Sequence, residues 1–128
     1  FKIMIRDLSR DYPDFLIASS KWFAFVPAKE YFDEPGDHAD ELETSVMMHY
    51  HPELVNLDEA GDGNYKKFAS QMLNEKVAWI PRNWQKVSQD TGIGNPKKAS
   101  AEKGKKYAEA VVAKYALLFE ELVHKELY

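Results

Sequence analysis

The chain has 128 residues, and 45% hydrophobic with 30% charged residues is the composition of one globular domain with its own core. Seventeen basic and 21 acidic residues leave a net charge of −4, which argues against nucleic-acid and anionic-membrane partners, because both bind basic surfaces. The chain contains no cysteine, so disulfides and thiolate metal sites are excluded, and any metal ion would bind His, Asp or Glu. No segment has the roughly 18 apolar residues of a membrane span, and we expect a cytoplasmic protein.

The beginning of the chain combines a helical pattern with a short apolar run. Residues 1–12 carry apolar side chains at helical spacing and predict an amphipathic helix that ends before Pro13. Residues 15–18, Phe-Leu-Ile-Ala, form a continuous apolar run, which is typical of a strand buried on both faces. A helix followed by a buried strand indicates an α/β protein with a parallel sheet. Residues 22–26 predict a second strand or an aromatic loop packed in the core.

The middle of the chain is rich in turns around one predicted helix. Pro35-Gly36 is a turn signal, and Asp37 is predicted to cap a helix over about residues 38–50. Residues 52–64 contain further turn residues, and residues 65–73 predict a short helix or irregular chain.

The last part of the chain is predicted to end in its longest helix. Residues 79–84 are aromatic and broken by proline, which favours an edge strand or a packed loop. Residues 91–96 form a tight loop, and residues 100–128 have an apolar stripe at helical spacing. Gly104 lies inside that helix, where it costs about 1 kcal/mol relative to alanine, so we expect it to mark a close packing contact.

Residues 36–45, called the acidic block below, contain one histidine, four carboxylates and two hydroxyls. Carboxylates this close repel one another unless they lie in water, cap a helix or face a cation. Asp37, Asp40 and Glu41 are explained as caps that offset the helix dipole. Glu43 instead enters an apolar face, where a carboxylate needs a partner or a bound cation.

His38 is the histidine of the acidic block and a candidate for chemistry. The positive end of a helix favours neutral imidazole, which is the form that accepts a proton or binds a metal. The alternative is a solvated surface histidine, because lone histidines are common. A triple-histidine metal site with His49 and His51 is disfavoured, since the 11 positions from His38 to His49 span about 16 Å along a helix.

Two separate blocks carry a resemblance to a known enzyme family. Residues 38–48, His-Ala-Asp-Glu-Leu-Glu-Thr-Ser-Val-Met-Met, and residues 52–55, Pro-Glu-Leu-Val, form the first block. They resemble the His-Ala-Gly-x-x-Glu-Thr-Ser-x-Met-Leu and Pro-x-Leu-Val segments of the creatininase (creatinine amidohydrolase) family. Residues 91–104 resemble its later Thr-Gly-x-x-Gly-Asp/Asn-Pro and Ala-x-x-Glu-Lys-Gly segment. Two blocks in the right order are much more specific than either alone, and the resemblance covers the chain from Phe15 onward.

The resemblance implies a fold, an activity and a cofactor. The family fold is a three-layer α/β/α sandwich with a mostly parallel sheet. Its members are metal-dependent amidohydrolases that cleave cyclic amides, formamides or related C–N bonds in small molecules, and they assemble as homo-oligomers, often hexamers. They typically hold two divalent ions (zinc, manganese or iron) with a Glu-x-His pair, an Asp and a His in a Gly-His-Gly-Gly-Asn motif.

Those ligand motifs do not occur in this sequence. In the family they precede the region that is matched here. Residues 1–128 are therefore expected to be the C-terminal portion of a single creatininase-like domain, with the main metal ligands upstream of Phe1. On this interpretation the 128-residue piece alone neither binds the two metals nor catalyses.

Four residues take expected roles from the resemblance. His38 matches the histidine of acid/base catalysis. Glu43 matches a glutamate that faces the same site and either binds a metal ion or contacts a residue that does. Trp22 matches a tryptophan near the substrate, and Glu34 stands in the place of a second such tryptophan. Asp40 replaces the usual glycine, and with Glu34 this departure makes creatinine an unexpected substrate.

Two other hypotheses stay open at this point. The first is a non-catalytic α/β interaction module in which the acidic block is a solvated helix cap. The second is an anion-binding domain that uses residues 91–96, although this loop lacks the third glycine of a dinucleotide fingerprint and the Gly-Lys-Ser/Thr of a P-loop.

Overall fold

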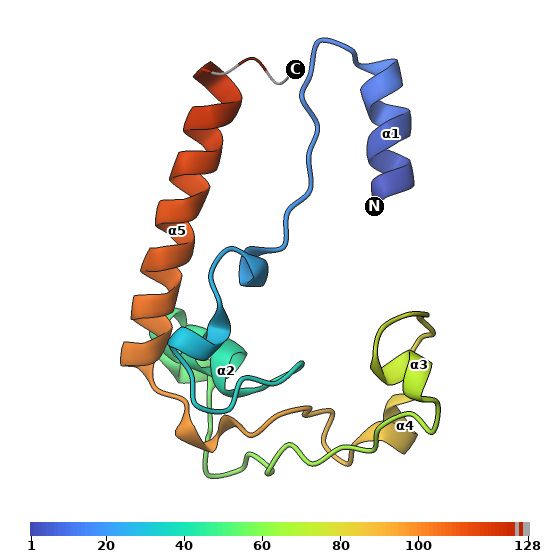
Figure 1. Ribbon diagram of the computed structural model, residues 1–128. Helices are drawn as coiled ribbons and strands as arrows, with labels where there is room; N and C mark the ends of the chain where they lie inside the picture. The colour runs from blue at the N-terminus through green and yellow to red at the C-terminus, as the bar shows by residue number, and fades with distance from the viewer. Residues whose placement is uncertain (125, 127–128) are drawn as a thin grey trace.

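The computed structural model describes residues 1–124 and 126 as helices joined by long irregular segments (Figure 1). Within these residues the α-helices are α1 (Lys2–Asp11), α2 (Glu41–Tyr50), α3 (Gln71–Asn74), α4 (Trp84–Val87) and α5 (Ala101–His124). Short 3-10 helices lie between them: η1 (Trp22–Ala24), η2 (Ala28–Glu30), η3 (Pro52–Leu54) and η4 (Pro96–Lys98). In this part of the chain no helix is both long and apolar enough to span a membrane.

The prediction of a mostly parallel sheet in a three-layer α/β/α sandwich is wrong for this structure. Over the described residues the chain forms no sheet, and the β-type pairing consists of isolated antiparallel bridges, His38 with Ile93 and Tyr65 with Ser88. The buried strand predicted at residues 15–18 is an exposed irregular segment, with Phe15 68% and Leu16 58% exposed. An apolar run predicts burial, but a strand also needs a neighbouring strand to pair its backbone N–H and C=O groups, and none lies beside it in the described chain.

The helices predicted from apolar periodicity are confirmed. The helix expected over residues 1–12 is α1, and the long helix expected over residues 100–128 is α5, of which residues 125, 127 and 128 lie outside the described residues. The helix expected over residues 38–50 is α2, and it begins at Glu41. Of the open alternatives, residues 22–26 form a short 3-10 turn in an aromatic loop and residues 79–84 form a loop that leads into α4.

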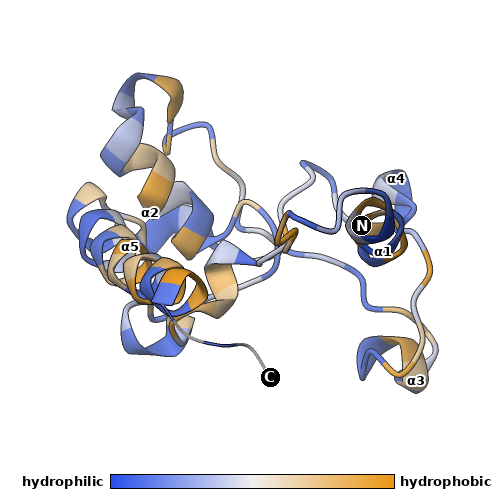
Figure 2. Ribbon diagram, turned by 90° about the horizontal axis from the view of Figure 1, so that it is seen from above, coloured by the Kyte–Doolittle hydropathy of each residue, from blue (hydrophilic) through white to orange (hydrophobic). Residues whose placement is uncertain are grey.

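The core lies where α2 crosses α5, and Figures 1 and 2 show these two helices side by side. Tyr107 of α5 is completely buried at its centre, and its hydroxyl donates to the carbonyl oxygens of Phe23 (3.2 Å) and Val26 (3.5 Å). The aromatic loop therefore packs on α5 through both ring contacts and hydrogen bonds. The buried apolar residues of this cluster are Val26, Phe32, Leu42, Tyr107 and Val111.

Helix α1 lies apart from this core in both views (Figures 1 and 2). None of its residues is buried, although its apolar side chains gather on one side. A ten-residue helix is marginal in water by itself, because nucleation costs more than so few hydrogen bonds return. Helix α1 therefore adds nothing to the packing that positions the acidic block.

The crossing of α2 and α5 depends on Gly104. A Cβ atom at this position would lie 1.9 Å from the carbonyl oxygen of Ser45 in α2, so the two backbones are in direct contact. Beside this contact, the buried hydroxyl of Ser45 accepts a hydrogen bond from the N–H of Ser100 (3.1 Å). The packing role predicted for Gly104 is thus confirmed.

We expect Gly104→Ala to destabilise the protein by about 1–3 kcal/mol in urea unfolding, because the methyl group must push the two helices apart. Helix propensity alone predicts the opposite sign, a gain of about 1 kcal/mol. Ala113→Gly, on the exposed side of α5, is the matched control and should cost about 1 kcal/mol through propensity only. An unchanged or raised stability of Gly104→Ala would contradict the close crossing.

Candidate functional site

The acidic block meets the loop that precedes η4. His38 and Ile93 form an antiparallel bridge in which His38 N–H donates to Ile93 O (3.1 Å) and Ile93 N–H donates to His38 O (2.8 Å). Asp37 N–H also donates to Ile93 O (2.8 Å). Glycines allow this approach: a Cβ at Gly36 would lie 2.4 Å from Ile93 O, and Gly94 has φ +119. Two segments distant in sequence therefore form one backbone unit around His38.

The start of α2 uses two carboxylates of the acidic block as caps. Asp40 is the N-cap, and its carboxylate accepts from the N–H of Glu43 (2.9 Å) and of Gly36 (2.5 Å). In return, Glu43 accepts from Ala39 N–H (2.7 Å), an arrangement close to a capping box. Ala39 has φ +48, a left-handed conformation that alanine rarely adopts, and this bond helps to hold it. The cap predicted at Asp40 is confirmed, and the cap predicted at Asp37 is wrong.

The sequence predicted Glu41 as a cap that offsets the helix dipole, and the structure shows that it also pairs with another helix. Its side chain is completely buried, and its carboxylate accepts from Glu34 N–H (2.7 Å) and from Lys103 Nζ of α5 (2.5 Å). Lys103 also donates to Asp33 (3.0 Å), and its hydrogen bonds to Glu41 and then to Asp33 raise the pKa of the Lys103 ammonium. An ion pair between a buried carboxylate of α2 and a partly exposed ammonium of α5 therefore lies behind the acidic block.

The side chain of His38 lies between a carboxylate and an indole. Its Nδ1 is 3.8 Å from Glu43 Oε2, and its ring centroid is 5.0 Å from that of Trp84. The side chains of His38 and Glu43 are 46% and 42% exposed. Glu43 was expected to enter an apolar face, but it lies at the surface, where it both caps α2 and faces His38.

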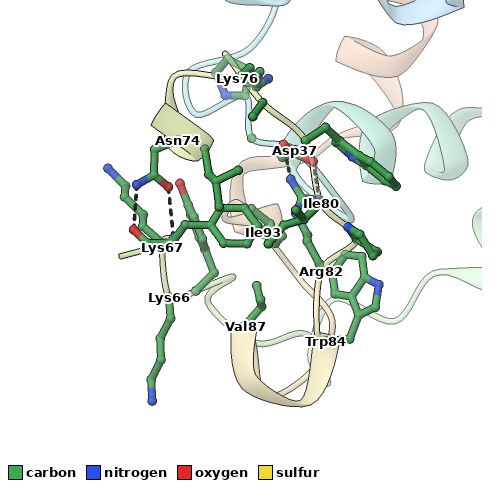
Figure 3. Close-up of a pocket in the computed structure, with 18 residues that line it drawn as sticks. Asp37, Lys66, Lys67, Asn74, Lys76, Ile80, Arg82, Trp84, Val87 and Ile93 are labelled. Atoms are coloured by element: carbon green, nitrogen blue, oxygen red, sulfur yellow. Dashed lines mark hydrogen bonds and ion pairs between the residues drawn. The ribbon is translucent and has the colours of Figure 1, made fainter. Parts of the chain in front are cut away.

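Asp37 forms an ion pair that the sequence did not predict. Arg82 Nη1 and Nη2 donate to its two carboxylate oxygens at 2.9 and 2.7 Å (Figure 3). These bonds hold the pKa of the Asp37 carboxyl below its usual value and raise that of the Arg82 guanidinium. The guanidinium carbon also lies 5.6 Å from the centre of the Trp84 ring. The aromatic and proline pattern of residues 79–84 predicted a packed loop, but nothing in it indicated which acid Arg82 would bind.

Two hollows lie near His38 and Glu43, although His38 itself lines neither of them. The larger is an open groove of about 960 Å³ whose wall includes Asp37, Arg82 and Trp84 (Figure 3). The smaller, of about 430 Å³, has Glu43 in its wall. The indole that touches His38 thus faces one hollow, and the carboxylate beside it faces the other. Residues of the acidic block thus line both hollows, Gly36 and Asp37 in the larger and Ala39, Glu43 and Thr44 in the smaller.

Comparisons with known proteins identify the family of this chain. The family model described as "Creatininase: Creatinine amidohydrolase" matches residues 1–119. This chain belongs to the creatininase family. A crystal structure of a protein named "Putative creatinine amidohydrolase", from Bacteroides fragilis, superposes with a TM-score of 0.92 and is 62% identical in sequence. The match covers 100% of this chain and 51% of that one, so the chain spans about half the length of this relative. No curated protein matches the chain.

The two family-derived pocket residues lie elsewhere in the structure. Trp22 packs edge-on against Tyr107 in the core, with ring centroids 6.0 Å apart. Glu34 forms an ion pair with Lys98 (2.8 Å), which lowers the pKa of the Glu34 carboxyl. The structure brings His38 and Glu43 together through their 3.8 Å contact, whereas Trp22 and Glu34 have their partners in the core and in Lys98 and line neither hollow. The substrate-facing role of Trp22 and Glu34 stays a prediction.

Creatininases are typically metal-dependent, and the donors in this chain can be tested against that need. Among the described residues, no group of three or more His, Cys, Asp or Glu side chains is placed to hold a metal ion. Glu43 is the carboxylate nearest His38, and one of its oxygens already accepts the Ala39 N–H. The described residues therefore do not fit a metal centre by themselves.

We expect Lys103→Met to destabilise the protein more than Glu41→Gln does, because it leaves a buried carboxylate without its cation. Glutamine at position 41 still accepts the Glu34 N–H. The double variant should then be more stable than Lys103→Met alone, a coupling that urea unfolding of the two singles and the double measures.

The control for this cycle is Lys106→Met, which breaks the exposed pair between Lys106 and Glu102 (2.7 Å) on the same helix. Exposed pairs contribute little, so the control should unfold as the parent does. Additive effects of the Glu41 and Lys103 substitutions on the free energy of unfolding would contradict an ion pair between these two side chains.

Proposed function

We propose that the chain supplies the acid/base part of a metal-dependent amidohydrolase, with His38 as the residue that moves the proton. The observation that supports this most directly is the position of His38. Its backbone is paired on both sides with Ile93, its ring is half exposed, and its Nδ1 faces Glu43 at 3.8 Å. The family blocks found at residues 38–55 and 91–104 thus meet at one histidine.

Hydrolysis of an amide needs a proton on the leaving nitrogen, and imidazole is suited to take and return one near neutral pH. When His38 carries that proton, the negative charge of Glu43 attracts the imidazolium. The ring is half exposed, and its neighbours Asp37 and Trp84 are in the wall of the larger groove. Glu43 then has two tasks, because the same carboxylate holds the turn at Ala39 and faces the imidazole.

The cofactor of the proposed enzyme is a pair of divalent ions, zinc, manganese or iron. When bound, such ions would supply Lewis-acid chemistry toward the carbonyl group of an amide. We assign the ligands to the part of the enzyme that corresponds to the unmatched half of the Bacteroides fragilis relative, since the described residues do not fit a metal centre. On this proposal the 128-residue chain alone is inactive, and the complete enzyme is a homo-oligomer.

The proposed substrate is a cyclic amide, a formamide or a related small C–N compound other than creatinine. Glu34 stands where the resemblance implies a tryptophan, and its charge is paired with Lys98. Asp40 stands where the resemblance implies a glycine, and it is the N-cap of α2. Both substitutions have a structural task in this chain, which supports a site shaped differently from that of an enzyme for creatinine.

The alternative of a non-catalytic module rests on one specific observation. Asp40 and Glu43 accept backbone N–H groups at the start of α2, as helix caps do. Capping accounts for these two carboxylates but leaves the contacts of His38 with Glu43 and Trp84 without a purpose. Assays of the intact protein, loaded with zinc, manganese or iron, against lactams, cyclic imides and formamides decide between the two. Hydrolysis of none of them would favour the interaction module.

We expect His38→Gln to lower kcat of the intact enzyme by about 10²- to 10⁴-fold, the range of general acid–base catalysis. Its melting temperature should stay close to that of the parent, because the bridge to Ile93 uses backbone atoms only. His49→Gln, on α2, is the matched control and should keep full activity. Parent-like kcat in His38→Gln would remove this histidine from the mechanism.

We expect Glu43→Gln to keep the fold but lower kcat by a few-fold to about tenfold. The attraction between a carboxylate and an imidazolium that are both half exposed contributes about 1 kcal/mol. The glutamine oxygen still accepts the Ala39 N–H. Glu43→Ala should lose stability as well, by about 1 kcal/mol, because the cap is removed. Steady-state kinetics and urea unfolding of both variants separate the two tasks. Equal kcat in Glu43→Gln and parent would limit Glu43 to capping.

A further inference from the structure

We infer that Arg82 and Trp84 are positioning residues for His38: Arg82 fixes Trp84 against the backbone of the acidic block, and Trp84 fixes the imidazole. This inference rests on the proposed role of His38 as the proton-transfer group. It adds two residues from a separate segment to the site. Neither of them belongs to the family blocks at residues 38–55 and 91–104. Three observations carry it, one for each contact between Asp37, Arg82, Trp84 and His38.

The first contact is the pair between Arg82 and Asp37. Two parallel hydrogen bonds of 2.9 and 2.7 Å join them, and the side chains are only 31% and 37% exposed. A two-bond contact with the planar guanidinium fixes orientation as well as distance, which a lysine cannot do. Asp37 is the residue before His38, and its N–H is bound to Ile93 O. Arg82 is therefore anchored to the same backbone unit that carries His38.

The second contact joins Arg82 to Trp84. The guanidinium carbon lies 5.6 Å from the centre of the indole, within the range of a cation–π contact. Trp84 is the first residue of α4, a helix of four residues that has little packing of its own. In Figure 3, Arg82 lies between Asp37 and Trp84 along the wall of the groove. The arginine thus links the start of α4 to the acidic block.

The third contact joins Trp84 to His38. Their ring centroids are 5.0 Å apart, with an angle of 47° between the planes. On another side, the imidazole faces Glu43 at 3.8 Å, a distance too long for a strong hydrogen bond to hold the ring by itself. Because the side chain is half exposed, the indole is the large group that limits its rotation.

The charges of this arrangement suit a proton-transfer histidine. The positive charge of Arg82 is balanced by Asp37, so the pair places little net charge beside His38. Orientation matters for the same step, since a displacement of about 1 Å can lower the rate by about 100-fold. Loss of Arg82 should therefore act on kcat through the direction of the imidazole rather than through substrate binding.

The test compares Arg82→Gln, Arg82→Lys, Trp84→Ala and Trp84→Phe in the intact protein. Lys86→Gln, an exposed position in α4, is the matched control. The first readout is NMR of protein labelled with ¹³C in the histidine rings. The sequence has four histidines, and the His38 signal is identified by its loss in His38→Gln. The ring current of Trp84 makes this signal sensitive to the distance between the two rings.

We expect Trp84→Ala and Arg82→Gln both to move the His38 ring signal while the other histidine signals stay in place. Trp84→Phe and Arg82→Lys should move it less, and Lys86→Gln should leave it unchanged. The second readout is kinetic: kcat should fall about 10- to 100-fold in Arg82→Gln and Trp84→Ala, with KM changed less than threefold. Trp84→Phe should restore most of kcat, because it keeps an aromatic face beside His38.

An unmoved His38 signal in Trp84→Ala and Arg82→Gln overturns the inference, whatever the activity. A moved signal with parent-like kcat also overturns it, because the contact would then be structural only. If Arg82→Gln fails to fold, the comparison of kcat in Trp84→Ala and Trp84→Phe decides the kinetic question, and equal kcat in these two variants overturns the inference. If the intact protein hydrolyses no amide, the proposed function fails, whereas the NMR readout still reports whether Arg82 and Trp84 hold the imidazole.

Discussion

The backbone contact between Gly104 of α5 and Ser45 of α2 determines where the rest of the site lies. With any larger side chain at position 104 the helices could not cross this closely. The close crossing is what lets Lys103 reach the buried carboxylate of Glu41 and lets Ser45 accept the N–H of Ser100. Each of these contacts joins the first family block to the second. The geometry around His38 is therefore a consequence of helix packing as much as of local loop structure.

The acidic block shows how four neighbouring carboxylates are tolerated. Each one has its own cation or donor. Asp37 is paired with Arg82 and Glu41 with Lys103. Asp40 accepts from two backbone N–H groups, and Glu43 accepts from Ala39 N–H and lies beside Nδ1 of His38. No two of them share a partner, so their mutual repulsion is offset one by one. The sequence predicted three caps and one carboxylate with a partner. In the structure two of the four carboxylates, Asp37 and Glu41, are instead bound to charged side chains distant in sequence.

Features that depend on residues close in sequence could be predicted, whereas contacts between residues distant in sequence could not. Helices α1, α2 and α5 and the close contact at Gly104 were predictable, because apolar spacing and a glycine in a helix are local signals. The partners of Glu41 and Asp37 were not, since Lys103 and Arg82 lie 62 and 45 positions away and any of 17 basic residues could have paired with them. The strand at residues 15–18 failed for a related reason: its apolar run contains no information about a second strand. The pairing of His38 with Glu43 was within reach, because both fall in one block of ten residues.

The residues around His38 differ in how much the stability of the fold depends on them. Asp40 and Glu41 hold the start of α2 and its contact with α5, so their replacement acts first on stability. Arg82 and Trp84 come from the loop before α4 and from its first residue, outside the α2 and α5 packing, and they contact the acidic block at Asp37 and His38. A segment attached by so few contacts can vary in sequence without loss of the core, and it forms the wall of the larger groove. The surroundings of the imidazole can therefore change along residues 79–84 while the backbone of His38 stays where the helices place it.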